Sequence, residues 1–596
     1  MRIRREILVA LSSVAAMATV ADTEYGYDPS DPKIYIATVH AGETNEISAA
    51  AVSVLNADGV TNFVKRGQGV LVSNKDITSY TGGIAIEDGI FRSVPNTQAN
   101  DTVGKLSGGG EIWVLDGATM ELYAPNMYST HMNGKTTHIA GGGFGGRGAL
   151  VACAGNLNQA GATFGSTIKL EADARVSNDG SNYFYLAVDG CTVDFNAKTL
   201  YAGGAGEIAF VNEPTLKNMP NPGTAIFSDG HGVKFGRPSS GSFNLWHTYC
   251  GIVLTNGSRL IISSLFGTNF AWPLTLHEGT GIHVTSTGAE WVANTQWNRL
   301  TANAVLSLLD GDRNWIQFNG AKDFLFIQGK ITGGGLNVRT YTPGSSLYLS
   351  NKDNSFTNGL VASRCAVHVM TNGALPSAGA AFSLTNAYAV FHSSQAYLLP
   401  PLAADGNCAV SNYTGFSASG AWRDSVTKTG TGTLAYRTLI GAPLLDVRGG
   451  TVKIEAVGGE LPAFEALGGS VNGTVDFGGN AYSVSKLAGA PQVVNCPALT
   501  VTAACEMETA TLDGSSGFST DGSLVFGAGA KLTVSDADLY PAGRRSRRWT
   551  IVSAEDGITG MPALDASLAG WTLAKSADGR TLALASPAVG FELIVR

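Results

Sequence analysis

The chain has 596 residues, of which 14% are charged, and its formal net charge is −8 at pH 7. Glycine occupies 76 positions and hydrophobic residues make up 44% of the sequence, which is enough apolar material for a core and excludes a disordered chain. The acidic balance excludes a nucleic-acid-binding surface, and no apolar run of about 18 residues follows the N-terminus, which excludes a transmembrane helix in the mature chain.

Residues 1–21 have the pattern of a secretory signal peptide. Three arginines within the first five residues precede an apolar stretch over residues 7–20, and small residues such as Ala16 and Ala18 offer cleavage points. We therefore expect the chain to be exported. The alternative is an anchor helix left in place, which we disfavour because the stretch is too short to cross a bilayer comfortably.

Short strand-like runs, rather than helical patterns, recur along the rest of the chain. Examples are Glu111–Leu115, Ser166–Leu170, Phe324–Ile327 and Thr451–Ile454, each bounded by residues such as Gly, Asn, Asp or Ser that favour turns. A long series of short strands without a clear linker favours a β-solenoid over a single sandwich, because coils add length without widening the core.

Two segments of the chain carry the motif K-x-G-x-G-x-L, with Lys65 and Lys428 as the lysines. A strand-like run starts at Gly89, 24 residues after the first lysine, and another starts at Gly450, 22 residues after the second. A unit of this length with a strand at each end is about one turn of a β-helix.

This pattern resembles the autotransporter-associated β-strand repeat, with matches at about 62–94 and 426–456. The resemblance implies a right-handed parallel β-helix, a pectin-lyase-like solenoid, in a secreted passenger-type protein. It also implies export through the inner membrane to the cell surface or exterior of a Gram-negative-type bacterium. The chain stops at Arg596, soon after its last repeat, so we expect a passenger that lacks the C-terminal membrane barrel.

The sequence thus predicts an all-β protein with three segments. These are the signal peptide at 1–21, a β-helical solenoid at 22–540 and a short β-rich closing segment at 541–596. Strand-like runs at Trp549–Ser553 and Gly570–Leu573 resemble the end of such passenger proteins.

Asp229 and His231 are the main candidates for catalysis. The turn Asp229-Gly-His231-Gly resembles that of the polygalacturonase group of β-helical glycosidases, and glycoside hydrolysis needs two carboxylates about 5–10 Å apart. The other motifs of that group are absent from the sequence. We therefore favour a tight turn with an exposed histidine and assign no catalytic residue.

Five of the nine tryptophans lie between residues 246 and 315. Exposed rings in this region would stack on sugar rings, and Trp272, Trp291 and Trp297 are the candidate binding residues. The alternative is that these rings fill the interior of the solenoid.

The sequence predicts no cofactor and no metal site. Gly143–Gly148 fits G-x-G-x-x-G, but the stretch after it is too short for the helix of a dinucleotide site, so we expect a glycine-rich corner. Asp310–Asn314 copies the start of a calcium loop, but Trp315 and Ala321 stand where that loop has its glycine and its acidic residue. The seven cysteines include no C-x-x-C pair, and their pairing and the oligomeric state stay open.

The leading hypothesis is an exported structural or adhesive display scaffold without catalytic activity, whose partner is a polysaccharide or a cell-surface glycan. The alternative is a carbohydrate-active lyase or glycoside hydrolase on the same β-helix. Release of reducing ends or of unsaturated uronate from a polysaccharide distinguishes the two.

Overall fold

The computed structural model describes residues 23–587 apart from a set of internal gaps. These gaps are 58, 76, 78, 95–109, 125–127, 131–134, 155–158, 162–165, 181–182, 188–190, 212–214, 219–222, 238–242, 246–249, 265–267, 286–297, 310–313, 321, 376–380, 508–516 and 535–546. The predicted signal peptide lies outside the described residues.

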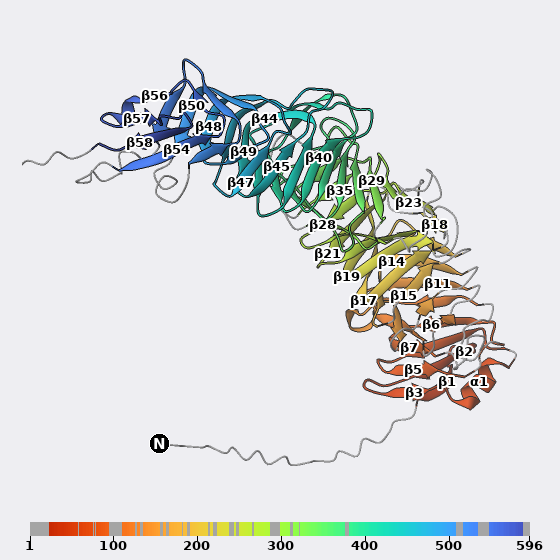
Figure 1. Cartoon of the computed structure of the whole chain (residues 1–596). Coiled ribbons are helices and arrows are strands. Elements are labelled where there is room, and N and C mark those ends of the chain that lie inside the picture. The colour runs from red at the N-terminus through yellow and green to blue at the C-terminus, as the bar shows by residue number, and fades with distance from the viewer. Residues whose placement is uncertain are drawn as a thin grey trace, which may run out of the picture. The chain divides into compact units, whose positions relative to one another are not determined.

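The described residues are nearly all β, with 59% strand and 3% helix, and they wind into a right-handed parallel β-solenoid of about 16 turns (Figure 1). This confirms the predicted fold class. Two units make up the chain: unit 1 comprises Met1–Ile208 and Pro214–Asn218, and unit 2 comprises Ala209–Glu213 and Met219–Arg596.

Unit 1 begins with an antiparallel hairpin and a short helix. Strand β1 (Glu24–Asp28) pairs with β2 (Asp31–Thr38), and helix α1 (Ala49–Leu55) follows shortly afterwards. The Ser48 side chain accepts a hydrogen bond from the backbone N–H of Ala51, which caps the first turn of α1. The helix has seven residues, and within the described ranges no helix is long and apolar enough to span a membrane.

The coils of unit 1 stack their strands in parallel columns. One column contains β4 (Asn62–Arg66), β6 (Gly83–Ile86), β8 (Ile112–Val114), β11 (Thr136–Gly141), β14 (Thr167–Asn178), β16 (Thr192–Asp194) and β18 (Thr215–Lys217). A second contains β3 (Thr44–Glu46), β5 (Val70–Ser73), β7 (Gly89–Ser93), β9 (Ala118–Ala124), β12 (Leu150–Ala154), the later part of β14 and β17 (Leu200–Val211). The short strands β10 (Tyr128–Thr130), β13 (Gln159–Gly161) and β15 (Tyr183–Ala187) form a third.

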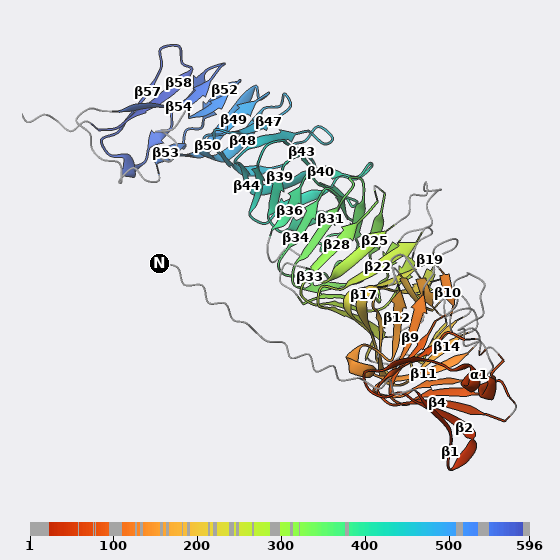
Figure 2. The same ribbon diagram turned by 90° about the horizontal axis from the view of Figure 1, so that it is seen from below.

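Unit 2 continues the same construction over more coils, and several of its strands lie side by side in both views (Figure 2). Its longest column contains β19 (Gly223–Arg237), β22 (Arg259–Ser264), β25 (Gly281–Thr285), β28 (Asn314–Phe318), β31 (Leu336–Thr340), β34 (Leu360–Ser363), β36 (Phe382–Thr385), β39 (Leu402–Asp405), β42 (Ser425–Thr429), β44 (Leu439–Val447), β46 (Phe464–Gly469), β48 (Tyr482–Gly489), β50 (Ala498–Met507), β53 (Lys531–Val534) and β56 (Ala563–Leu564).

A separate sheet of unit 2 contains β20 (Phe243–Leu245), β23 (Thr268–Phe270), β26 (Asn298–Leu300), β29 (Phe324–Ile327), β32 (Ser346–Leu349), β35 (Ala366–Val369), β37 (Tyr388–Phe391), β40 (Cys408–Asn412), β43 (Thr433–Arg437), β45 (Gly450–Ile454), β47 (Gly473–Asp476), β49 (Gln492–Val494), β51 (Phe518–Thr520) and β54 (Arg548–Ala554). The remaining parallel strands are β21 (Cys250–Thr255), β24 (Leu274–Leu276), β27 (Leu306–Leu308), β30 (Ile331–Gly333), β33 (Ser355–Phe356), β38 (Ala396–Leu399), β41 (Ser419–Trp422), β52 (Ser523–Phe526) and β55 (Ile558–Thr559).

The core consists of columns of apolar side chains, one from each coil. Leu325, Leu347, Val367, Ala389 and Val410 are successive partners in the register of β29, β32, β35, β37 and β40, and all five are fully buried. Side chains alternate between the two faces of a strand, so each inward residue has outward neighbours. The next coil completes the burial of each large aliphatic side chain. Full burial of one such side chain contributes roughly 1.5–3 kcal/mol to the stability of the fold.

The shared K-x-G-x-G-x-L motif places a lysine inside the solenoid. Lys65 is fully buried, and its ammonium donates to the carbonyl oxygens of Gly67, of Gly69 at 2.7 Å and of Asp88 at 2.6 Å. Lys428, also fully buried, donates to carbonyl oxygens of its own turn, including that of Gly430 at 3.1 Å. Each lysine thus satisfies turn carbonyls that water cannot reach.

One coil after each motif, a glycine packs against the turn that contains the buried lysine. Gly89 and Gly450 have φ angles of 65° and 67°, in the left-handed region. A Cβ atom at Gly450 would lie 2.4 Å from the carbonyl oxygen of Gly432, and one at Gly89 would lie 2.5 Å from that of Gly67. Both positions therefore require glycine, because the next coil passes directly against the lysine turn.

The last described residues of unit 2 change from parallel to antiparallel pairing. β54 pairs antiparallel with β58 (Thr581–Ala585), which pairs antiparallel with β57 (Thr572–Lys575). The rings of Trp549 and Trp571 stack here with centroids 5.8 Å apart. This is the predicted β-rich C-terminal segment.

Candidate functional site

Asp229 and His231 lie on β19, and each contacts a side chain of the following coil. Asn256 donates a hydrogen bond to the Asp229 carboxylate, and Nη2 of Arg259 lies 3.0 Å from Nε2 of His231. A guanidinium can only donate, so Nε2 of His231 is the acceptor in this contact.

The Asp229 contact recurs elsewhere in the solenoid. Asn218 donates to Asp194 at 2.8 Å, and Asn495 donates to Asp476 at 3.0 Å. In each pair the asparagine belongs to the coil after the aspartate and has a φ angle near 50°. Asp229 thus corresponds to Asp194 and Asp476, whose hydrogen bonds join one turn to the next. This is a structural role.

Trp272 lies in the core of unit 2. It is fully buried, and its ring contacts those of Phe235 and Phe270, with centroids 5.5 Å away in both cases. Its ring is therefore not available to a ligand in this structure. For Trp272 the alternative holds that the ring fills the interior of the solenoid. Trp291 and Trp297 lie outside the described residues.

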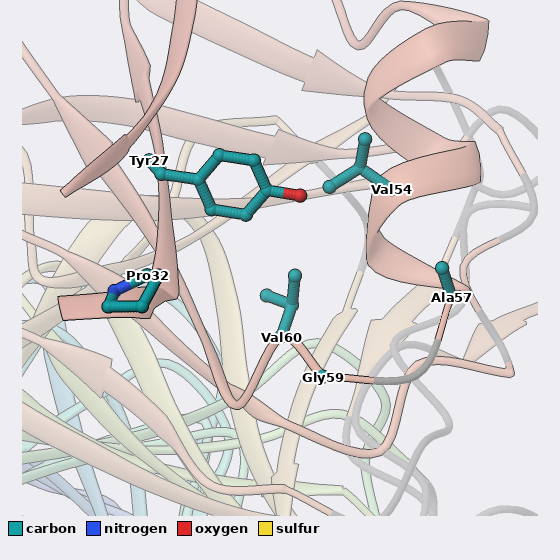
Figure 3. Close-up of a pocket in the computed structure, with 6 residues that line it drawn as sticks. All are labelled: Tyr27, Pro32, Val54, Ala57, Gly59 and Val60. Carbon is teal, nitrogen blue, oxygen red and sulfur yellow. The ribbon is translucent and has the colours of Figure 1, made fainter.

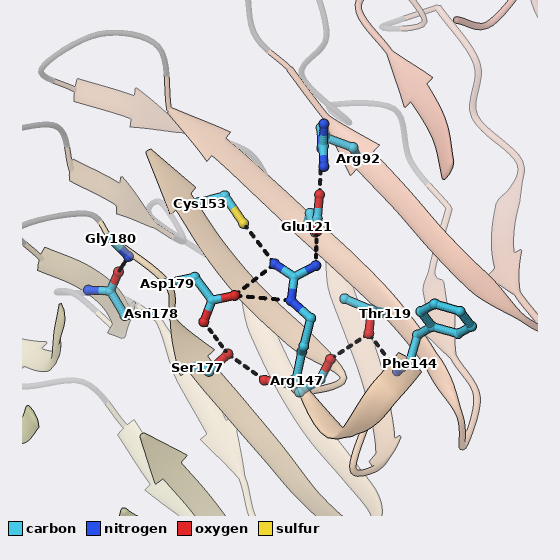
Figure 4. Close-up of polar contacts among 11 residues, drawn as sticks. Arg92, Thr119, Glu121, Phe144, Arg147, Cys153, Ser177, Asn178, Asp179 and Gly180 are labelled. Atoms are coloured by element: carbon cyan, nitrogen blue, oxygen red, sulfur yellow. Dashed lines mark hydrogen bonds and ion pairs between the residues drawn. The ribbon is translucent and has the colours of Figure 1, made fainter. Parts of the chain in front are cut away.

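The glycine-rich corner at Gly143–Gly148 folds back against the sheet of unit 1 (Figure 4). The Thr119 hydroxyl donates to the carbonyl oxygen of Gly148 and accepts from the N–H of Phe144, both at 2.7 Å. The corner is a three-residue 3₁₀ turn rather than the start of a long helix, and it carries Arg147 to the outer face of the sheet.

Arg147 joins two carboxylates there (Figure 4). It lies 2.6 Å from Glu121 and 2.7 Å from Asp179, and Arg92 lies 2.5 Å from the other oxygen of Glu121. Burial lowers the pKa of Arg147, but hydrogen bonds with Asp179 and Glu121 outweigh this effect and raise it. The Glu121 side chain is fully buried between two guanidinium groups, which compensate its charge.

Cys153 borders this network, with its Sγ atom 3.7 Å from Nη2 of Arg147. Burial raises the pKa of the Cys153 thiol to about 12, so it stays protonated and a poor nucleophile. No group of three or more His, Cys, Asp or Glu residues in the described part of the chain is arranged to hold a metal ion. Of the calcium-like stretch Asp310–Asn314, residues 310–313 lie outside the described ranges.

A small pocket of about 220 Å³ lies between the N-terminal hairpin and α1 (Figure 3). Its lining is mostly apolar and comprises Tyr27, Pro32, Val54, Ala57, Gly59 and Val60. Ligand sites for drug-sized molecules usually measure roughly 300–1,000 Å³. This pocket is smaller, and no charged side chain is among these six residues.

A column of rings crosses the outer face of the second sheet of unit 2. Phe326, Tyr348, His368, His392 and Tyr413 come from five consecutive coils, at β29, β32, β35, β37 and β40 or just after them. Successive ring centroids are 5.7, 4.1, 5.0 and 4.3 Å apart. Three of these four ring pairs are stacked, whereas His368 and His392 are tilted by 50°. The first four rings are half-buried, and Tyr413 at the end of the column is 50% exposed.

The two histidines of this ring column are hydrogen-bonded to each other. Nδ1 of His368 lies 2.7 Å from Nε2 of His392, so one neutral ring donates to the other. Burial, together with the neighbouring His392, lowers the pKa of His368 to about 4, and burial also lowers that of His392. Both rings are therefore neutral at pH 7.

A second cluster lies on the outer face of unit 1. The Trp113 ring, at β8, stacks on that of His138, at β11, with centroids 3.7 Å apart and an interplanar angle of 1°. Nδ1 of His138 lies 2.6 Å from Glu171, which Lys169 also contacts at 2.9 Å. The pKa of Glu171 is lowered by its hydrogen bonds with Lys169 and His138, and the pKa of Lys169 is raised by its hydrogen bond with Glu171.

The sequence did not predict either cluster. Their successive rings are separated by 20 to 25 residues and come together only through the register between coils, for example Trp113 with His138 and Tyr348 with His368. An outward-facing aromatic residue recurring once per coil was the available signal, but coil lengths vary and obscure it.

The chain matches no protein-family model, no curated protein and no solved structure in the comparisons made. The resemblance to autotransporter-associated β-strand repeats therefore stays a prediction that depends on the two motif copies at about 62–94 and 426–456.

Proposed function

We propose that this protein is an exported display scaffold that binds polysaccharide or cell-surface glycan along its surface and catalyses no reaction. The ring column from Phe326 to Tyr413 is the observation that supports this proposal. It offers part-exposed aromatic rings and the Tyr413 hydroxyl at the spacing of successive coils, about 4.8 Å. A repeated surface of this kind suits a long partner that contacts many coils weakly.

The ionisable groups that would serve catalysis are engaged in holding coils together. Asp229 accepts from Asn256, and Glu121 lies buried between Arg92 and Arg147. A general acid or base must instead reach the substrate at about 2.6–3.2 Å. These contacts favour the scaffold over the lyase or hydrolase alternative.

The test is retention of the mature protein on immobilised polysaccharides and on cells. We expect Tyr413→Ala to weaken binding at least tenfold, because it removes the most exposed ring of the column. Tyr341→Ala is the matched control, since Tyr341 is 68% exposed but follows β31 in another column. Its binding should equal that of the unmodified protein.

Enzyme activity is measured on the same panel. Release of reducing ends or of unsaturated uronate that disappears in Asp229→Ala or His231→Ala would overturn the scaffold proposal in favour of an enzyme. Equal binding by Tyr413→Ala and Tyr341→Ala would overturn the role of the ring column.

A further inference from the structure

Trp113 ends a stack of side chains on the outer face of unit 1. One face of its indole ring is covered by His138, 3.7 Å away. On the other side, the register places Ala85 of β6 opposite Trp113. A methyl group is too small to cover an indole ring, and Trp113 remains 37% exposed. Among the residues that the structure describes, this aromatic face is therefore open to a ligand.

A negative charge lies beside Trp113 on this face. Because side chains alternate along a strand, Gly83 shares the outer face with Ala85, and Glu111 shares it with Trp113. The space next to Gly83 is taken by the side chain of Asn62, whose Oδ1 would lie 2.8 Å from a Cβ atom there. The Glu111 side chain is 57% exposed, so a carboxylate stands next to the open ring.

The Glu111 carboxylate can accept from a ligand. The neighbouring His138 is only 5% exposed, and its Nδ1 is paired with Glu171 at 2.6 Å. Its buried Nε2 makes no hydrogen bond within the described structure and lies 3.4 Å from Oε2 of Glu111. Two carboxylates, Glu111 and Glu171, thus lie beside this imidazole at the edge of the open ring, and the exposed one favours a donor with positive charge.

We propose that Trp113 and Glu111 form a binding site for an amino-sugar residue whose amino group is protonated. The apolar face of the pyranose packs on the indole, while the ammonium group donates to Glu111 and is attracted by the ring electrons. This inference builds on the proposed function, because it names the class of glycan that the scaffold binds.

The surrounding charges select against acidic sugars. Lys169 is paired with Glu171 at 2.9 Å, and Lys135 is only 3% exposed and donates to the carbonyl oxygen of Gly110, next to Glu111 in the chain, at 3.1 Å. A uronate carboxylate would gain little from these two cations, and Glu111 would repel it. The net charge of −8 adds to this preference at long range.

The test compares three hexamers of equal length by calorimetry and by intrinsic tryptophan fluorescence. These are a glucosamine hexamer at a pH where its amino groups are protonated, its fully N-acetylated form and a galacturonate hexamer. We expect the glucosamine hexamer to bind at least tenfold more tightly than the other two. Trp113→Ala should abolish this binding, and Glu111→Gln should weaken it at least tenfold.

Two controls match these variants. Leu115→Ala removes an apolar side chain that is 41% exposed just after β8, and Glu46→Gln removes a carboxylate that is 61% exposed and paired with Lys75. Both should bind like the unmodified protein. Far-ultraviolet circular dichroism checks that each variant is folded.

Three results would overturn the inference: no binding of the glucosamine hexamer, unchanged binding in folded Trp113→Ala, or equal affinity for all three hexamers. Loss of glycan retention in Tyr413→Ala together with unchanged Trp113→Ala would refute this site while the scaffold function stands. Retention unaffected by Tyr413→Ala but lost in Trp113→Ala would refute the role of the ring column instead.

Discussion

Replacement of Lys65 by methionine removes a buried ammonium group while keeping a side chain of similar length. Three carbonyl oxygens lose their donor, including those of Gly69 and Asp88 at 2.7 and 2.6 Å. Hydrogen bonds from a charged donor contribute about 2 kcal/mol each. Burial lowers the pKa of Lys65 to about 8, which corresponds to a cost of about 3 kcal/mol for its charged form. The three hydrogen bonds together contribute about 6 kcal/mol, which is more than this cost. We therefore expect Lys65→Met to destabilise the surrounding coils by about 3 kcal/mol.

The effect should be local, because a coil in a solenoid contacts only its neighbours. Native-state hydrogen exchange is the appropriate assay, since it measures the opening free energy of β4, β5 and β7 separately from distant coils. Lys75→Met is the matched control: Lys75 is 46% exposed and lies 3.8 Å from Glu46, so its loss should cost less than about 1 kcal/mol. If amides of β5 and β7 exchange equally fast in both variants, the lysine does not stabilise the turn and our reasoning is wrong.

Three further predictions concern stability. Gly450→Ala should cost at least about 3 kcal/mol in urea unfolding and Gly459→Ala about 1 kcal/mol, because both have positive φ but only Gly450 lies against a neighbouring carbonyl. Glu121→Gln should cost about 3–5 kcal/mol by leaving two arginines without their shared carboxylate, whereas Glu87→Gln, 35% exposed, should cost under about 1 kcal/mol. The pKa of His368 is about 4 in the fold against an ordinary 6.5. Its contribution to the free energy of unfolding is therefore complete above about pH 6.5 and falls by about 3 kcal/mol towards about pH 4. His368→Phe should remove this dependence on pH.

Each of these predictions has a result that contradicts it. Equal unfolding midpoints for the two glycine variants would show that the neighbouring carbonyl does not restrict the Gly450 position. A Glu121→Gln protein as stable as Glu87→Gln would mean that the buried carboxylate is not needed by its arginines. An unchanged pH slope in His368→Phe would place the titrating group elsewhere.

The winding of the chain was predictable from the sequence because the responsible signals are local. Turn residues mark the ends of short strands. The spacing from Lys65 to Gly89 and from Lys428 to Gly450 is slightly longer than one coil, since Lys65 pairs with Ile86 and Lys428 with Val447 of the next coil. In the structure these two lysines have the same buried position and these two glycines the same left-handed backbone. The local motif therefore indicated the coil, although not that the lysine points inward.

The surface chemistry was less predictable, since it depends on register between coils. One residue of slip moves a side chain from the outer face to the core, and the sequence does not fix that register. Trp272, in the bend between β23 and β24, is buried, while Trp113, which the sequence did not single out, is partly exposed. Helix α1 was also missed, although Ser48 before a run of alanines is a recognisable start signal.

The aspartate–asparagine pairs between turns have a consequence for how such a chain can evolve. The paired residues are 24 positions apart at Asp194 and Asn218, 27 at Asp229 and Asn256, and 19 at Asp476 and Asn495. The same aspartate–asparagine hydrogen bond thus recurs at three places, while the number of residues between its two partners differs. Insertions and deletions in the intervening loops can accumulate without shifting the alignment of one turn on the next, so surface loops are free to diversify over an unchanged frame.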